Sequence, residues 1–494
     1  MPRSRTSIDA RAALHAAVVS TVIRLAPGHG PPHQRHLSLL AAAAATPVPP
    51  TWIDPAARAV IALFAARARR DNLTDGAALV RRYFEGVRLT RPAELADGIR
   101  SQLHASVGEY CNAVGWPQMG ARFGAEALLF ADTEALRYRA LTVVALGQAL
   151  NGEYESARVS LANAREVFAA QGWARADTAY VEFLAETLIA SAHLQVDRLH
   201  AVSAAMAAAQ PDDPYWAHSA RSVEAMAQML RGDMDGGLAA IQTLLSEEGA
   251  RHSHTMTRHF LVCMRSDMLV AQGRSAEALA TLAPHENPEG HGICFSMQRA
   301  ASLLHLGRER ELLAETEACV ATGADHCLRT LTPLLLRRAL AHRRLGERDR
   351  ATASTEAAMV LLLRTGTSGT PFVMLPHGET RDLIAAVMLE RPEFRDAMPC
   401  VFDALAVVTA PDLPAPRFGL LAGLTPTERT LTHRLTTSLS IAGIAEERGV
   451  SVNTVKSQVR SVYAKLGVRG RYEAVEALTR SANAQPACGR TADG

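Results

Sequence analysis

The chain has 494 residues, which is longer than one ordinary domain, so we expect at least two domains. Hydrophobic residues reach 48% and aromatic residues only 5%, and the abundance of alanine and leucine favours helices over strands. The net charge of +2 excludes a chain that is basic throughout. The basic excess is instead local: residues 417–480 hold ten Lys or Arg and five Asp or Glu, against 42 and 45 elsewhere. Such a segment suits binding to phosphate groups.

Membrane insertion and secretion are not predicted. No uncharged apolar run reaches about 18 residues, the length that a membrane span needs. No charged and apolar signal peptide begins the chain, and the apolar stretch 14–25 is interrupted by His15 and Arg24. The seven cysteines are an odd number without a CxxC pair, which is typical of free thiols in a reducing compartment. We therefore expect a cytoplasmic protein.

Residues 1–50 are predicted to be loosely structured or helical, and residues 51–400 to form an all-α repeat region. Polar turns separate amphipathic runs at Gly115, Gly152, Val196, Gly232, Gly273, Gly307 and Gly346. The distances between successive turns are 37, 44, 36, 41, 34 and 39 residues. A helical hairpin repeated every ~34 to 40 residues is typical of a tetratricopeptide-like solenoid, which presents a concave binding face. An irregular all-α domain is the alternative.

One unit of the region has the clearest repeat pattern. It consists of Leu146, Gly147, Leu150, Gly152, Tyr154, Ala157, Leu161 and Ala164. Residues 365–380 break the helical pattern and are predicted to form a loop that caps the array. A proline-rich linker follows at 401–416, where three prolines fall within six residues and disfavour a helix. Beyond it we place a second domain at 417–482, whose motifs decide its function, and a disordered tail at 483–494.

The segment 424–451 has the signals of two short helices and a tight turn. Thr425, Pro426 and Glu428 form a capping box with proline at the first helical position. Leu431 and Leu435 follow one turn apart on a buried face. The second helix is predicted from its cap Ser440 to Gly449, with Ile441, Ile444 and Ala445 as its apolar residues, and Ser451 caps a third.

The third helix, predicted over residues 452–466, has one apolar and one polar face. The apolar stripe consists of Val452, Val455, Val459, Val462 and Leu466. The opposite face carries Asn453, Ser457, Arg460 and Ser461, flanked by the only two lysines of the chain, Lys456 and Lys465. Arginine and lysine bind phosphate or guanine, and asparagine pairs with adenine. The layout predicts a helix-turn-helix that places this helix in the major groove of double-stranded DNA.

These residues resemble the LuxR-type (GerE-type) helix-turn-helix family. The matching elements are Leu424-Thr425-Pro426, Glu428, Ile444-Ala445, Ser451, Asn453-Thr454-Val455-Lys456, Lys465-Leu466-Gly467-Val468, Arg471 and Glu473-Ala474-Val475. The resemblance implies a four-helix domain in a transcription regulator. It implies that Lys456, Ser457 and Arg460 reach bases and phosphates, and that Asn453 and Thr454 lie beside the DNA backbone. We add Lys465 to the DNA-binding set.

The resemblance also implies a fourth helix over residues 471–482 that pairs two copies on DNA. Val475 and Leu478 would be its apolar anchors. The chain departs from the family at Ser438, at Ala442-Gly443 and at Gln458, where glycine, a Lys-Glu pair and histidine are frequent. These departures keep open a rival interpretation, in which the chain is a helical repeat scaffold with a vestigial DNA-binding module.

The sequence shows little sign of catalysis. A phosphate-binding P-loop needs a lysine, and none precedes Lys456. One group of possible metal ligands consists of His252, His254, His259, Cys263, His285, His291 and Cys294. Imidazole and thiolate suit zinc or copper, but the spacing matches no specific motif. A metal- or thiol-dependent enzyme is therefore the second rival, and we assign no metal ligand, cofactor or catalytic residue. We expect the array to bind an effector, which could be a protein, a peptide, a small molecule or RNA polymerase.

Overall fold

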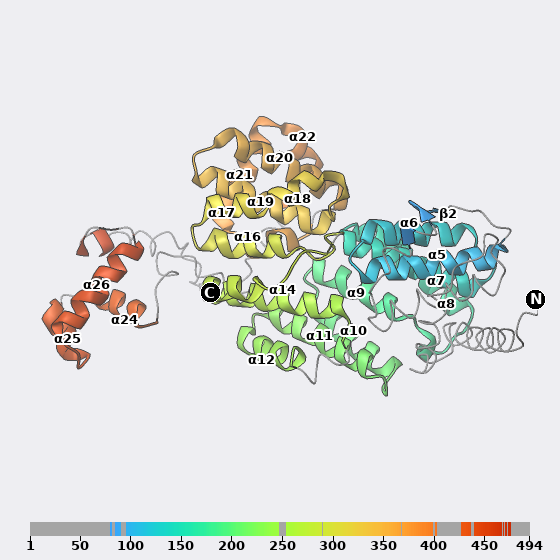
Figure 1. The fold of residues 1–494 in the computed structure, drawn as a ribbon, viewed down its shortest axis with the longest axis horizontal. Coiled ribbons are helices and arrows are strands. Elements are labelled where there is room, and N and C mark those ends of the chain that lie inside the picture. Colours follow the sequence, from blue (N-terminus) through green and yellow to red (C-terminus); the bar gives the residue numbers. More distant parts are fainter. Residues whose placement is uncertain are drawn as a thin grey trace, which may run out of the picture.

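The computed structural model describes residues 80–81, 84–89, 95–246, 253–288, 290–366, 368–398, 401–402, 426–435, 439–466, 468, 470–471 and 473–475. Among them the only strands are β1 (Phe84–Glu85) and β2 (Arg88–Leu89), which form an antiparallel hairpin. Helices make up most of the rest, which confirms the all-α class (Figure 1). The segments 1–50 and 483–494 and most of the linker 401–416 lie outside the described residues.

The helices of the array follow one another along the chain in pairs, and the two helices of each pair pack on each other. The first pairs are α5 (Asp97–Ala113) with α6 (Pro117–Leu129), α7 (Glu134–Asn151) with α8 (Tyr154–Ala170), α9 (Tyr180–Ala192) with α10 (Val196–Ala209), and α11 (Pro214–Arg231) with α12 (Met234–Leu244). The later pairs are α14 (Thr255–Ala271) with α15 (Ser275–Leu282), α16 (Phe295–His305) with α17 (Glu309–Glu315), α19 (Leu328–Arg344) with α20 (Arg348–Thr365), and α21 (His377–Glu390) with α22 (Pro392–Ala397). Three short 3₁₀ turns and one short helix lie between pairs: η1 (Arg175–Asp177), α18 (Glu317–Thr322), η2 (Gly323–Asp325) and η3 (Thr370–Phe372).

Each predicted polar turn joins the two helices of one pair. Gly152 ends α7 with φ of +90°, and its amide donates to the Ala149 carbonyl. This left-handed conformation costs a residue with a Cβ atom more than it costs glycine. At the one predicted turn without glycine, Leu194 takes φ of +55°. Turn chemistry therefore predicted the first seven helix pairs correctly, whereas the α21–α22 pair was not predicted.

The unit with the clearest repeat pattern packs as its sequence indicates. Leu146, Leu150, Ala157 and Leu161 belong to one buried cluster. A Cβ atom on Gly147 would lie 2.5 Å from the Ala121 backbone nitrogen, so glycine lets α6 and α7 cross closely. The array is repeat-like in this sense, and its closer likeness to tetratricopeptide repeats stays a prediction.

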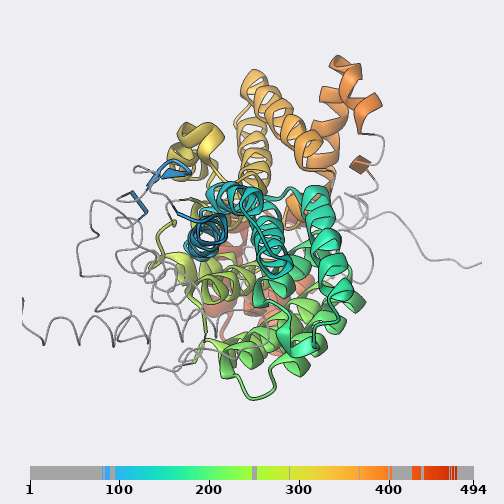
Figure 2. The ribbon, with the colours of Figure 1, turned by 90° about the vertical axis from the view of Figure 1, so that its right-hand side faces the viewer.

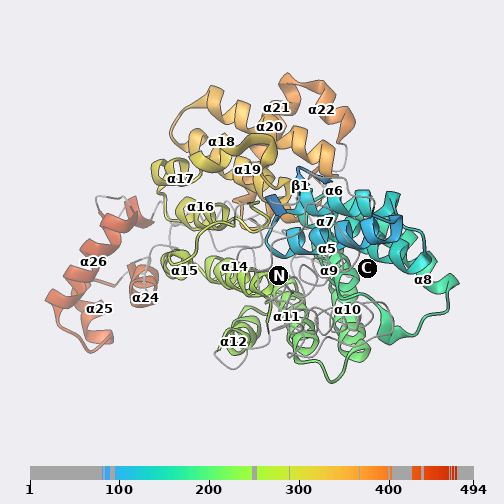
Figure 3. The ribbon, with the colours of Figure 1, turned by 45° about the vertical axis from the view of Figure 1, so that its right-hand side comes forward.

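The first helices of the pairs form a continuous inner layer. α5 packs on α7, α7 on α9, α9 on α11, α11 on α14, α14 on α16 and α16 on α19. The layer curves so strongly that α19 returns to contact α7, and Figure 3 shows these two helices near each other. Figure 2 shows the cyan helices flanked by green helices below and orange helices above. Within the described part of the chain, no helix is both long and apolar enough to cross a membrane.

The segment 365–380 does not cap the array, contrary to expectation, because α21 and α22 follow it. Phe372 and Leu375 are buried in the core of the last helices, and the Met374 carbonyl contacts His305 Nε2 at 2.8 Å. The segment is an internal connection that the surrounding helices hold by its apolar side chains.

The C-terminal helices form a separate group, drawn in red in Figure 1. They are α24 (Pro426–Leu435), α25 (Ile441–Glu447) and α26 (Val452–Leu466). Their core consists of Leu431, Leu435, Ile444, Ala445, Val455, Val459 and Val462. All of these come from the C-terminal helices, so this domain has a hydrophobic core of its own.

Candidate nucleic-acid interface and ligand pocket

The turn between α25 and α26 is built by the capping residues that the sequence predicts. Ser440 Oγ accepts from the Gly443 amide at 3.1 Å at the start of α25. Gly449 takes φ of +63°, and the Val450 amide closes the helix end by donating to the Ala445 carbonyl at 3.0 Å. Ser451 Oγ then accepts from the Thr454 amide at 3.1 Å and starts α26. Thr425, the first residue of the predicted capping box, lies outside the described residues.

The buried apolar stripe of α26 is shorter than predicted. Val455, Val459 and Val462 are buried, as expected, against α24 and α25. Val452 is 39% exposed, so its predicted burial is wrong. It is the first residue of α26, and the packed stripe begins one turn later, at Val455.

The outer face of α26 presents most of the predicted DNA-binding residues together. Asn453, Thr454, Lys456, Ser457 and Arg460 are all exposed. Among the described residues, neither Lys456 nor Arg460 takes part in an ion pair. Two cations and three short polar side chains on one helical face are the chemistry that contacts phosphates and base edges.

Lys465 and Ser461 lie on a different side of α26. Lys465 Nζ donates to Glu428 Oε2 and Ser461 Oγ donates to Glu428 Oε1, both at 2.7 Å. The Glu428 side chain is nearly buried, so these contacts hold α26 against α24. Ser461 therefore faces α24 and not the outer side, where the helical wheel placed it. A DNA contact by Lys465 stays a prediction.

Two further polar contacts brace the domain. Arg448, just after α25, donates to Gln458 Oε1 at 2.8 Å, which ties the turn to α26. Arg471 donates to the Leu435 carbonyl at 2.9 Å and to the Leu439 carbonyl at 2.7 Å. The resemblance singled out Arg471 without a role, and the structure shows it binding backbone oxygens at and beyond the end of α24.

The predicted pairing helix is described only in part. Residues 473–475 are helical, Ala474 is buried and Val475 is half-buried. Leu478 lies outside the described residues. The dimer therefore stays a prediction.

A comparison with known families bears on this geometry. The family described as "Bacterial regulatory proteins, luxR family" matches residues 422–478, which include α24, α25 and α26. These residues are a LuxR-type helix-turn-helix domain. The domain indicates a regulator that binds DNA, and the match leaves the helical array outside it. No curated protein matches the chain.

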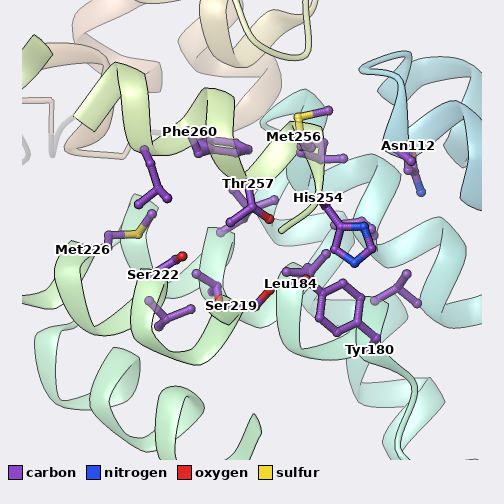
Figure 4. Close-up of a pocket in the computed structure, with 18 of the residues that line it drawn as sticks. Asn112, Tyr180, Leu184, Ser219, Ser222, Met226, His254, Met256, Thr257 and Phe260 are labelled. Carbon is purple, nitrogen blue, oxygen red and sulfur yellow. Dashed lines mark hydrogen bonds between the residues drawn. The ribbon is translucent and has the colours of Figure 1, made fainter. Parts of the chain in front are cut away.

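A pocket of about 140 Å³ lies on the inner layer of the array (Figure 4). Its walls come from α5, α7, α9, α11 and α14, the first helices of five successive pairs. The apolar lining includes Leu146, Leu150, Val181, Leu184, Leu188, Val223, Met226, Met256, Phe260, Leu261 and Met264. A space walled by several helices and lined by apolar side chains suits a small ligand.

One end of this pocket is polar. Figure 4 shows the His254 imidazole beside the Tyr180 ring, and their ring centroids are 5.3 Å apart. Tyr180 Oη lies 2.5 Å from Ser219 Oγ. These groups can exchange hydrogen bonds with a polar group on an otherwise apolar molecule. No sequence motif predicted this pocket, because its walls come from residues spread over five helices.

The structure divides the histidines and cysteines that the sequence analysis grouped. His259 and His285 pack on Phe295, with ring centroids 5.1 and 4.9 Å from its ring, and Cys263 is buried in the same cluster. His291 and Cys294 instead meet two residues that the sequence analysis missed, Cys319 and His326. Sequence spacing could not find this group, because Cys319 follows Cys294 only after the whole α16–α17 pair.

The two thiols of this group differ in acidity. The hydrogen bond from the Cys294 thiol, together with the neighbouring His291 and His326 imidazoles, holds the pKa of Cys319 well below its ordinary value. Burial and the neighbouring sulfur raise the pKa of Cys294.

Proposed function

We propose that the protein is a cytoplasmic transcription regulator that binds a specific sequence in double-stranded DNA. The observation that carries the proposal is the outer face of α26, within a domain that matches the luxR family. Lys456 and Arg460 are exposed there beside Asn453 and Ser457. With α26 in the major groove, the cations bind phosphate or guanine, while Thr454 at the helix start contacts the DNA backbone.

We further propose that the helical array regulates the DNA-binding domain. Its inner pocket, with an apolar wall and the Tyr180, Ser219 and His254 end, supports binding of a small and largely apolar effector. A protein or peptide effector, and RNA polymerase, are the other partners that such an array could bind.

Two copies are proposed to bind DNA together through the helix that contains Val475 and Leu478. A two-fold dimer places its recognition helices about 34 Å apart, one turn of B-DNA. The target would then be a pair of inverted half-sites.

The DNA-binding proposal is tested with charge-removing variants of the full chain. Lys456→Ala and Arg460→Ala should weaken DNA binding, and a variant that removes one phosphate interaction should reduce the salt slope by about one. Arg158→Ala is the matched control, because Arg158 is an exposed cation on α8 whose ion pair is with Glu155. Binding is measured by titration on the preferred site at several salt concentrations, after circular dichroism has verified folding.

The same titration decides between the regulator and the scaffold with a vestigial module. The proposal requires weaker binding by both α26 variants and unchanged binding by Arg158→Ala. Full-length protein that binds no DNA sequence tightly, or α26 variants that match the wild type at equal salt, would favour the scaffold.

A further inference from the structure

Four potential metal ligands converge where the α16–α18 segment meets the start of α19. His291 and Cys294 precede α16, Cys319 lies in α18, and His326 closely precedes α19. Their ligand atoms all lie within 4.8 Å of one another. The Cys294 and Cys319 sulfurs are 3.7 Å apart, and Cys319 Sγ is 3.9 Å from His291 Nδ1. The two imidazole rings have centroids 4.2 Å apart.

These distances suit a tetrahedral zinc ion. Zinc lies about 2.3 Å from thiolate sulfur and about 2.0 Å from imidazole nitrogen, so two sulfurs on one ion are about 3.8 Å apart. The observed 3.7 Å between the sulfurs is close to that expected distance. A disulfide would need about 2.05 Å between the sulfurs. The distance from Cys319 Sγ to His291 Nδ1 is a few tenths of an ångström longer than the distance between a sulfur and a nitrogen ligand of one tetrahedral zinc ion. A small rotation of the imidazole would remove this difference.

The surroundings orient His326 toward the centre of the group. His326 Nδ1 contacts the Cys327 carbonyl at 3.0 Å, which places the proton on Nδ1 and leaves a lone pair on Nε2. That Nε2 atom is buried without a hydrogen-bond partner among the described groups. Burying such an atom without a partner is unfavourable, and a metal ion would supply the partner.

Amide groups lie against both sulfurs, and a bound metal ion would favour the thiolate form of each. Cys294 is the N-cap of α16, and its sulfur accepts from the Met297 amide at 3.3 Å. The positive end of a helix stabilises a thiolate. Asn287 Nδ2 lies 4.0 Å from Cys319 Sγ, so a second amide group supports the other sulfur.

We propose that His291, Cys294, Cys319 and His326 bind one structural zinc ion. Two sulfur and two nitrogen ligands match the preference of zinc, and four protein ligands leave no open position for substrate. Cys294 and Cys319 are 1% exposed and His326 is fully buried, which suits a closed site. Each thiol that binds gives up its proton to solvent, so affinity falls in acid.

The site lies where the array closes on itself. The His326 carbonyl accepts from Gln118 Nε2 at 3.2 Å, and the next residue, Cys327, donates to the Leu150 carbonyl. The Gly292 amide donates to the Gly115 carbonyl at 3.0 Å. Zinc would therefore fix the two segments that hold the later helix pairs against the turns of the first two pairs. Its removal should loosen the packing of α19 on α7.

The experiment measures metal in the full chain, purified under reducing conditions without chelator. We expect about one zinc ion per chain and close to none in Cys319→Ser or His326→Gln. Cys263→Ser is the matched control, because Cys263 is a buried thiol outside the group. It should retain its zinc. Removal of zinc by a chelator should lower the Tm of the array, and Zn²⁺ alone should restore it.

A second measurement on wild-type protein does not depend on the folding of variants. Cobalt(II) in place of zinc should give the visible absorption of a tetrahedral ion and a sulfur-to-cobalt charge-transfer band. Wild-type protein that holds no zinc and gives no such spectrum would overturn the proposal. So would zinc retained in both ligand variants, or a Cys294–Cys319 disulfide as the only species in protein purified under reducing conditions.

Discussion

A single carboxylate joins two helices of the DNA-binding domain. Glu428 of α24 is nearly buried and accepts from both Ser461 and Lys465 of α26. A buried acceptor with two donors stabilises the domain more than an exposed ion pair does, because water cannot replace it fully. These hydrogen bonds lie behind the exposed face of α26, so they act on stability and position the recognition helix.

Glu428→Ala should destabilise the C-terminal domain by about 1 to 3 kcal/mol, because it removes a buried acceptor shared by two donors. Amide exchange in α24 and α26 should then be roughly tenfold faster or more. Glu446→Ala is the control, since it removes the same charge from an exposed position of α25. Equal exchange in the two variants would contradict a structural role for Glu428.

At the residue scale, sequence reasoning succeeded where the cause is local. Ser440, Gly449 and Ser451 were predicted because a cap or a left-handed turn depends on residues only a few positions away. Ser461 was misplaced because the helical wheel shows which way a side chain points and not what packs against it. Cys319 was missed because tertiary packing alone brings it to Cys294, and the same holds for His326.

At the scale of elements, the crossing of α6 with α7 depends on the absence of a side chain at Gly147. Gly147 of α7 faces the backbone of α6, where a Cβ atom would lie 2.5 Å from the Ala121 nitrogen and 2.9 Å from the Pro117 oxygen. Backbone atoms cannot rotate away as a flexible side chain can. The two helices would have to separate.

Gly147→Ala should therefore lower the stability of the array by about 1 to 3 kcal/mol, in spite of the better helix propensity of alanine. Gly378→Ala in α21 is the matched control, because nothing lies within 4 Å of its added Cβ atom. Thermal unfolding of the two variants separates the gain in helix propensity, which both share, from the steric clash, which only Gly147→Ala has. A Tm for Gly147→Ala equal to or above that of Gly378→Ala would show that the crossing tolerates a methyl group.

Seven of the eight helix pairs were predictable at this scale because each has a short polar turn with a residue at positive φ, such as Gly152 or Leu194. The pocket was not predictable. Its wall contains Leu146, Val223 and Phe260 from three different pairs, and only the curvature of the inner layer brings them together. The sequence predicted a concave binding face for the array, but it did not indicate which residues line a pocket or which ligand they bind.

At the scale of the whole molecule, the chain combines a closed helical array with a domain that has its own core. The array closes through hydrogen bonds such as that between Leu328 and Asn151, which are 177 positions apart. No sequence period encodes this closure. The C-terminal core cluster of the described residues, by contrast, draws only on side chains between Leu431 and Tyr463, all from the DNA-binding domain itself.

A fragment of residues 417–494 should therefore fold and bind the same DNA sequence as the full chain. If the array regulates the domain, the full chain should differ from the fragment in affinity, in the number of copies bound per site or in transcriptional output. Titration on one DNA site, with stoichiometry from analytical ultracentrifugation and a reporter assay, measures all three. The fragment with Lys456→Ala is the control for specific binding.

The outcomes of this comparison separate the roles of the two parts. Two copies of the fragment on inverted half-sites would support the pairing helix around Val475, whereas one copy on a single half-site would count against the dimer. A full chain that differs from the fragment would show that the array acts on DNA binding or on transcription. Identical affinity, stoichiometry and output would remove the regulatory role of the array. The pocket beside Tyr180 and His254 would then need a function unconnected with DNA.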